Sequence, residues 1–457
     1  MKYAEFQFGF VLAAIGIALI SGFGYAAMLS GMIGFDLLMG DWLVGMIQAH
    51  GHAQLMGWTG LMIVGVSLYF LPRLSGVPLR FSGLQPWICF FFVVGILIRT
   101  IGQPLLSGTF PVPVRNILQW GLGLSGILEA AGVGFYLILL VSTIWGKGTV
   151  RPAMRSIRIY FLMAVCGWLS YTVINTVLVL QATWQGVGFV HMAWNRLGID
   201  LFVSLVLLPV AMAFSIRTFP LYLRLPTADW PVERLGTVYL LAVVLEHVPV
   251  LGRLLEISLY GNILLSLGQI LKGGALLFLI WKLNVLLRVH PPWTVNRIGE
   301  PGPERRSTRP GLPDYGEFGR FELLLYGAYV WLALAACLEI IAGLGFWSGF
   351  SSPADPDALR HIYLAGFISL LIFGMAPRML PGFLHQRKVA YPALVAVTFW
   401  LVGVAAFFRV GPLMLAGFVD YIPDGPLILS IVFGFSGVLG WAAVWVLAGN
   451  LWATWQG

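Results

Sequence analysis

The chain alternates long apolar runs with short polar stretches over nearly its whole length. A helix that crosses a membrane needs about 20 consecutive, mostly apolar residues. By this criterion the pattern predicts an all-α, polytopic integral membrane protein with about twelve transmembrane helices. The predicted spans lie near residues 7–31, 43–71, 85–105, 117–146, 157–181, 197–220, 236–256, 261–288, 320–346, 358–381, 389–409 and 427–453.

Lysine and arginine concentrate in every second loop. Positively charged loops stay in the cytoplasm, so we predict that both termini are cytoplasmic and that the protein lies in a bacterial inner membrane. The first seven residues carry one lysine and one glutamate before the first apolar run, which predicts an uncleaved first helix. The loops after even-numbered spans contain Arg73, Arg80, Lys147, Arg151, Arg155, Arg158, Arg224, Arg234, Arg297, Arg305, Arg306, Arg309, Arg387 and Lys388.

The longest connection is residues 289–319, which are rich in proline, glycine and arginine. Such a segment cannot bury apolar area, so we predict a cytoplasmic linker between the eighth and ninth spans. The spans on either side of it are expected to form a single transmembrane domain over residues 1–457.

Two segments of the chain are similar to each other without gaps. His52 is followed by Gly57, Gly65 and Leu71-Pro72, and His361 is followed at identical spacing by Gly366, Gly374 and Leu380-Pro381. The similarity is compatible with three four-helix repeats, over residues 1–150, 151–290 and 318–457. The alternative is ordinary packing of small residues between membrane helices.

Composition narrows the class further. Hydrophobic residues make up 59% of the chain and charged residues 10%, and the mean hydropathy is +0.88. A soluble domain carries about 25% charged residues, so this surface suits lipid and not water. The three cysteines form no disulfide or metal-binding spacing, and no basic stripe predicts a nucleic-acid partner. No phosphate-binding glycine loop or nucleophile triad is present.

Five histidines fall on the predicted outer half of the membrane: His50, His52, His191, His247 and His361. Positions two apart point about 200° apart on a helix, so His50 and His52 cannot face one metal. His52 and His361 stand at matched depth, as two axial ligands of a haem b require, although a pair of packing histidines remains the alternative. His50, His191 and His247 are candidates for copper or a second haem, or are interfacial histidines.

Several charged residues also lie within predicted spans. Arg99 is positioned to pair with a haem propionate or to reach the membrane interface. Glu129, Glu246 and Glu339 are candidates for relaying protons or for bonding a neighbouring helix, because ionisable groups in lipid are costly. Lys272 is a further intramembrane cation for which the sequence alone indicates no partner.

The segments AHGHAQLMGW, GILIRTIG, SIRTFPLY and HIYLAGFISLLIFGMAPRMLPG resemble the NnrS family. That resemblance implies a twelve-helix bacterial membrane protein with haem and copper, linked to nitric oxide metabolism. In the second span the family's W-H-x-H-E-M motif corresponds here to Gln48–Gln54, without the glutamate. The chain is also distantly similar to the main subunit of haem-copper oxidases and nitric oxide reductases, which implies that His52 (or His50) and His361 ligate a low-spin haem.

Three hypotheses follow. The first is an NnrS-type haem b protein, with copper as a second cofactor, that acts in nitric oxide defence or membrane electron transfer. The second is a catalytic oxidoreductase with a non-standard metal site, although the sixth span lacks the histidine that such enzymes use. The third is a transporter without a cofactor. Expected partners are membrane lipid, a small gas such as nitric oxide, and a redox partner subunit; nucleic acid is not expected.

Overall fold

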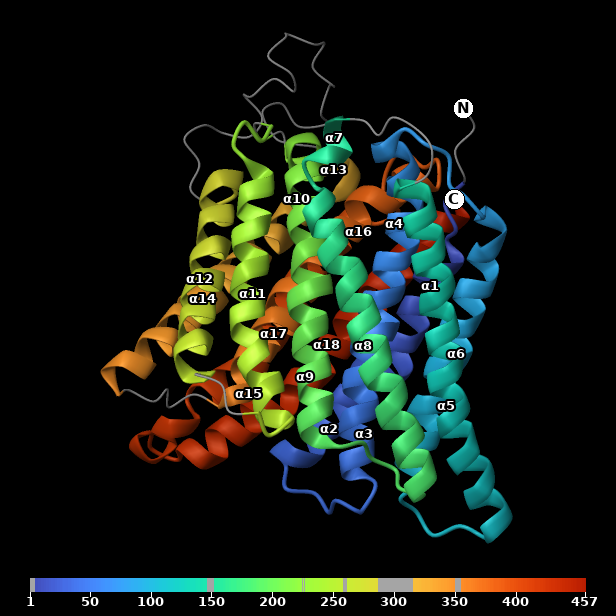
Figure 1. Ribbon diagram of the computed structural model, residues 1–457, viewed down its shortest axis with the longest axis vertical. Coiled ribbons are helices and arrows are strands. Elements are labelled where there is room, and N and C mark those ends of the chain that lie inside the picture. The colour runs from blue at the N-terminus through green and yellow to red at the C-terminus, as the bar shows by residue number, and fades with distance from the viewer. Residues whose placement is uncertain are drawn as a thin grey trace. The chain divides into compact units, whose positions relative to one another are not determined.

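The computed structural model describes residues 5–145, 152–223, 225, 227–257, 261–286, 315–349 and 355–457, and every regular element within these ranges is a helix (Figure 1). Within this described part, twelve helical stretches are long and apolar enough to cross a membrane. The prediction of a polytopic, all-α membrane protein is therefore confirmed. The predicted linker lies outside the described residues up to residue 314, and the cytoplasmic side of the two termini stays a prediction from loop charge.

Packing contacts divide the chain into two compact units, Met1–Leu207 and Leu208–Gly457, and the boundary falls within the sixth span. The single domain and the three repeats predicted from the sequence stay predictions. The first unit contains α1 (Gly9–Ile17), η1 (Ala18–Gly22), α2 (Phe23–Gly34), α3 (Leu43–His52), η2 (Ala53–Gly60), α4 (Leu61–Ser75), η3 (Ser82–Leu84), α5 (Gln85–Leu105), α6 (Val112–Ile144), α7 (Pro152–Arg155), α8 (Arg158–Gln185), α9 (Met192–Phe202) and η4 (Val203–Leu207).

The second unit begins with the other half of the sixth span. Its elements are α10 (Leu208–Tyr222), α11 (Val232–Leu254), α12 (Gly261–Leu283), α13 (Tyr315–Phe318), α14 (Phe321–Ser348), α15 (Pro356–His361), η6 (Ile362–Ser369), α16 (Leu370–Phe383), α17 (Pro392–Met414), η7 (Ala416–Tyr421) and α18 (Gly425–Gln456).

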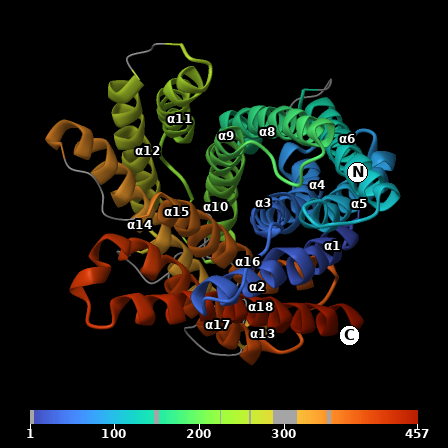
Figure 2. The same ribbon diagram turned by 90° about the horizontal axis from the view of Figure 1, so that it is seen from below.

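In the first unit, α5, α6 and α8 curve around α3 and α4 (Figure 2). Aromatic side chains fill the space between these helices: Trp168 of α8 meets Phe202 of α9 edge to face, with ring centroids 4.9 Å apart. The outward surface is apolar instead of charged, and Trp184 is 85% exposed. Exposing so much apolar surface to water would be unfavourable, whereas contact with lipid chains is not.

In the second unit, α11, α12 and α14 follow one another side by side, and η6 and α16 pack on α14 (Figure 2). Consecutive spans are thus neighbours, and this holds for α12 and α14 even though the longest connection of the chain joins them. This order brings one face from each of the seventh, eighth, ninth and tenth spans together.

The second and tenth spans share an unusual local geometry. Both change from α-helix to an eight-residue π-helical segment directly after a histidine: η2 follows His52, and η6 follows His361. Single π-helical turns are rare and occur frequently at functional sites. The two segments that are similar in sequence therefore also deviate from the α-helix at the same position.

The glycines of these two segments serve close helix packing. A Cβ at Gly57 would lie 2.4 Å from Ile17 Cγ2, and one at Gly65 would lie 2.7 Å from Phe10 Cβ, both on the first span. In the tenth span a Cβ at Gly366 would lie 2.6 Å from Trp331 Cγ on the ninth. In both segments the equivalent glycines let a span approach the span that precedes it in the chain.

Candidate functional site

His50 and His52 end α3 and contact different helices. His50 Nδ1 lies 2.9 Å from the Gly22 carbonyl oxygen of the first span. His52 Nδ1 lies 3.0 Å from the Tyr171 hydroxyl of the fifth span, and its Nε2 lies 2.7 Å from Glu129 Oε2 of the fourth. A regular helix turns about 200° over two residues, which accounts for the different neighbours.

His52, Glu129 and Tyr171 form the centre of a polar group that we call the His52 cluster. All three are buried, and Glu129 is only 1% exposed. The Tyr171 hydroxyl can donate to Nδ1, whereas Nε2 lies close to the Glu129 carboxylate but neither Nε2 nor Oε2 has a hydrogen-bond partner of acceptable geometry among the described residues. Both ring nitrogens of His52 thus lie close to side chains of this unit.

Arg99 extends the His52 cluster along α5. Its Nε donates to Gln103 Oε1 at 3.1 Å, and its Nη1 donates to the Asn175 side chain of α8. The side chain is 1% exposed, so the guanidinium is enclosed by protein instead of reaching an interface. With Arg99 and Glu129 the cluster carries one formal charge of each sign, which limits the cost of burying both.

Gln48 ties the same cluster to the loop before α9. Gln103 Nε2 donates to Gln48 Oε1 at 3.0 Å, and the Val190 amide donates to the same oxygen at 2.8 Å. Gln48 Nε2 returns a bond to the Val190 carbonyl at 2.9 Å. Both backbone hydrogen-bonding groups of Val190 are thus satisfied by the Gln48 side chain.

The second unit contains another buried group, which we call the Lys272 cluster. Lys272 Nζ of α12 lies 2.7 and 2.6 Å from the two carboxylate oxygens of Glu246 on α11. It also lies 2.6 Å from Glu339 Oε1 on α14, and the Tyr363 hydroxyl of η6 donates to that oxygen at 3.0 Å. The cation for which the sequence indicated no partner therefore has two.

His247 borders the Lys272 cluster. Its Nδ1 lies 2.9 Å from the Val243 carbonyl oxygen and 3.8 Å from Glu246 Oε2. A carbonyl oxygen can only accept a hydrogen bond, so Nδ1 carries the proton. The same reasoning applies to His361 in the tenth span, whose Nδ1 lies 2.8 Å from the Asp357 carbonyl oxygen.

The proposed copper ligands do not form a cluster in the described part of the chain. No group of three or more His, Cys, Asp or Glu side chains among the described residues is arranged to hold a metal ion. His191 is an exposed residue directly before α9, and its side chain forms no cap bond there. Copper binding by His50, His191 or His247 stays a prediction.

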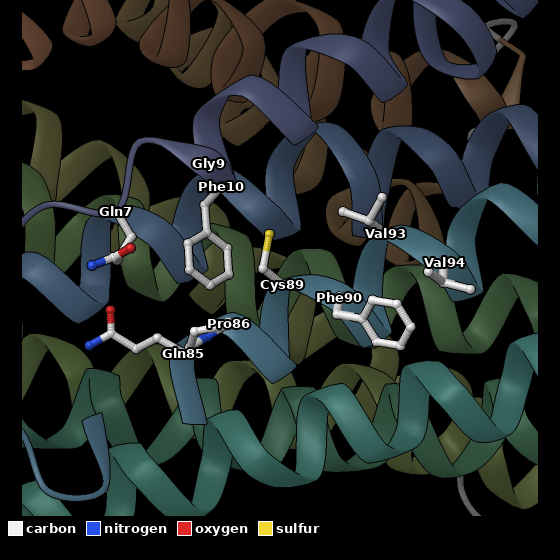
Figure 3. A pocket seen from close by; sticks show the side chains of 9 residues that line it. All are labelled: Gln7, Gly9, Phe10, Gln85, Pro86, Cys89, Phe90, Val93 and Val94. Carbon is white, nitrogen blue, oxygen red and sulfur yellow. The ribbon is translucent and has the colours of Figure 1, made fainter. Parts of the chain in front are cut away.

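A surface pocket of about 400 Å³ lies between the first and third spans. The Gln7 and Gln85 side chains lie at one end, and Val93 and Val94 lie toward the other (Figure 3). None of its residues belongs to the His52 or the Lys272 cluster. The pocket is lined by Gln7, Gly9, Phe10, Gln85, Pro86, Cys89, Phe90, Val93 and Val94.

Solved structures of known proteins share this fold. Among 31 similar chains is one from a cryo-EM structure of a haem-copper terminal oxidase dimer. The TM-score is 0.67 at 14% identity, and the alignment covers 98% of this chain and 83% of that one. No protein-family model and no curated protein matches the chain. The protein is therefore a multi-pass membrane protein with the fold of that oxidase chain.

The sequence identified the charged members of both clusters but missed their uncharged partners. The residues missed are Gln48, Gln103, Tyr171 and Asn175, which carry no charge and match no motif individually. Their spacing could have indicated them, because three pairs of polar residues are four positions apart and residues at this spacing lie on the same face of a helix. These pairs are Gln48 and His52, Arg99 and Gln103, and Tyr171 and Asn175.

Proposed function

We propose that this protein binds haem b and transfers electrons in the membrane, in the manner of the NnrS-type proteins that its sequence resembles, with His50 and His361 each a candidate iron ligand. The fold supports the class, because the oxidase with a similar chain is described as a haem-copper enzyme. The coarser assignment, a membrane protein with an oxidoreductase-type fold, does not depend on the choice of ligands.

The observation that carries the proposal is the hydrogen bonding of His50 and His361. Each histidine directs Nδ1 to a backbone carbonyl oxygen, at 2.9 Å to Gly22 and 2.8 Å to Asp357. This bond fixes the tautomer with the proton on Nδ1 and the lone pair on Nε2, which is the arrangement of most iron-ligating histidines. The chemistry of these donors therefore fits a haem.

His52 fits less well as an axial ligand. Its Nε2 is within 2.7 Å of the Glu129 carboxylate, and its Nδ1 is within 3.0 Å of the Tyr171 hydroxyl. Nε2 has no hydrogen-bond partner among the described residues, but ligation through it would require the Glu129 carboxylate 2.7 Å away to move inside the bundle. We therefore assign the ligand role in the second span to His50 and a positioning role to His52.

A bound haem would supply one-electron redox chemistry and an iron able to bind a diatomic gas. His50 and His361 would hold the iron, and the carbonyl oxygens of Gly22 and Asp357 would orient the two imidazoles. The proposal includes nitric oxide as the gas and a separate redox partner subunit as the electron source.

The test is a reduced-minus-oxidised absorption spectrum of the detergent-purified protein. We expect a b-type haem signal in the wild type, and its loss in His50→Ala and in His361→Ala. His52→Ala is the matched control, because it removes an imidazole two residues away on the same helix and should retain most of the bound haem. Adding nitric oxide to the reduced wild type should shift the spectrum.

Two results would contradict the proposal. A colourless wild type with a normal helical circular dichroism spectrum would exclude haem and favour the transporter hypothesis. Loss of haem in His52→Ala but not in His50→Ala would move the ligand role to His52. Metal analysis of the same preparation decides whether copper is bound, and bound non-haem metal together with turnover of nitric oxide would favour a catalytic centre.

A further inference from the structure

The Lys272 cluster contains more negative than positive groups. Two carboxylates, Glu246 and Glu339, contact the single ammonium of Lys272. The Lys272 and Glu339 side chains are 4% and 0% exposed, and that of Glu246 is 14% exposed. If both carboxylates were ionised, the cluster would carry a net negative charge inside a membrane helix bundle, where an uncompensated charge is costly.

Among the described residues, the other groups around the two carboxylates do not supply a second cation that contacts Glu339. His247 is adjacent to Glu246, with its Nδ1 3.8 Å from Oε2, and the Nδ1 proton is directed to Val243. The Tyr363 hydroxyl donates a hydrogen bond to Glu339 Oε1 and remains an uncharged phenol. Tyr239 of α11 lies near Tyr363 and is likewise a phenol. One added proton would make the cluster neutral.

The contacts distinguish the two carboxylates. Both oxygens of Glu246 contact Lys272, as expected of an ionised carboxylate that faces an ammonium. In Glu339 only Oε1 contacts Lys272 and accepts the Tyr363 bond. Oε2 of Glu339 is buried and has no hydrogen-bond partner among the described residues. A buried ionised oxygen without a donor is the more expensive state, and a protonated one is cheaper.

We infer that Glu339 is a proton-binding site: its Oε2 holds one proton while Lys272 and Glu246 remain an ion pair. The ligand is the proton itself, and no redox partner is required. This site belongs to the second unit and is independent of haem binding. A proton that is held on one carboxylate among four adjoining spans gives the protein a group that can be loaded and unloaded within the membrane.

Infrared spectroscopy measures the inferred proton directly, because a protonated carboxylic acid has a carbonyl stretching band that an ionised carboxylate lacks. The measurement is the infrared spectrum of the purified full chain at a series of pH values. The spectrum of Glu339→Gln is subtracted at each pH, so that bands from any other carboxylic acid cancel. We expect one acid band at neutral pH that shifts in heavy water and disappears at high pH. It should be absent from Glu339→Gln.

Tyr363→Phe is the variant that identifies the carboxylate. Removing the hydroxyl deletes the hydrogen bond to Glu339 Oε1, so the band should move to higher frequency at unchanged amplitude if Glu339 is the acid. Lys272→Met should add a second acid band, since no cation would remain for Glu246. The absence of a wild-type band, or a band that Tyr363→Phe leaves in place, would overturn the inference. These readouts do not depend on bound haem.

Discussion

Individual polar side chains inside this membrane protein are bonded to one another with little redundancy. Arg99 of α5 is buried and bonds two amide side chains, Gln103 of its own helix and Asn175 of α8. Lys272 has two carboxylate partners, and Gln48 occupies both backbone groups of Val190. The loss of stability on substituting such a residue is therefore set mainly by the buried groups that it leaves without a partner, and less by the strength of the lost bond.

Lys272→Met should destabilise the protein by about 3–5 kcal/mol, because Glu246 loses its buried cation and can stay in the bundle only by taking up a proton, with the contacts of both carboxylates to the ammonium lost. The expected result is a clear drop in the thermal unfolding midpoint in detergent. Adding Glu246→Gln and Glu339→Gln to the same chain removes the orphaned carboxylates and should restore much of the loss. A triple variant no more stable than the single one would contradict this account.

Gln48→Leu should cost about 1–3 kcal/mol for each backbone or side-chain group that it leaves unsatisfied. The amide and carbonyl of Val190 and the Gln103 amide all lose a partner. Gln119→Leu is the control, because Gln119 is only partly buried and makes one bond, to the Thr183 carbonyl oxygen at 2.7 Å. Comparable midpoints for the two variants would show that the Val190 loop finds water instead.

At the level of whole helices, glycine determines how closely adjacent spans pack. Gly366→Ala places a methyl group against Trp331, at the base of a ring that cannot move without shifting α14. We expect a loss of about 1–3 kcal/mol from overpacking. Gly382→Ala in the same span adds a methyl group where no atom lies within 4 Å, so its thermal midpoint should equal or exceed that of the wild type.

The positions of the spans could be predicted from hydrophobicity because lipid requires about 20 apolar residues for a crossing. The helix ends could not, since helices continue past the apolar run. The fourth span was predicted from residue 117 and begins at Val112, and the second was predicted to residue 71 and ends at Ser75. The π-helical segments were also not predicted, because nothing in the residue types after His52 or His361 distinguishes them from an ordinary helix.

The candidate site was predictable in part. Charged residues within spans stand out, so Arg99, Glu129 and the charged members of the Lys272 cluster could be found one by one. Their grouping depends on which helices are neighbours and on the rotation of each helix, and the local sequence does not encode these. The different neighbours of His50 and His52 could not be predicted either, because Gly22, Tyr171 and Glu129 come from three other spans.

For the molecule as a whole, the orientation in the membrane is the property that remains to be measured. Twelve crossings place the two ends of the chain on the same side, and the loop charges predict that this side is the cytoplasm. The loop before the twelfth span should then face outward, and the loop after the tenth span should face inward. Tyr421 is 85% exposed and belongs to the first of these loops.

Single-cysteine labelling tests this orientation. In a chain with Cys89, Cys166 and Cys337 replaced by serine, Tyr421→Cys should react with a membrane-impermeant maleimide on cells whose inner membrane is intact. Lys388→Cys should react only after the membrane is opened. The reverse pattern would invert the topology and would place the candidate histidines on the cytoplasmic half.

The π-helical segments have a consequence for how the second and tenth spans can change. In an α-helix each added residue turns everything beyond it by about 100°. A π-helical turn holds about one residue more than an α-helical turn, so η2 and η6 can absorb an extra residue without rotating the rest of the span. Deleting one residue from η2 should therefore convert it towards an α-helix while His52 and the Gly65 face both keep their neighbours. Each of these two spans can thus gain or lose a single residue between its histidine end and its packing end.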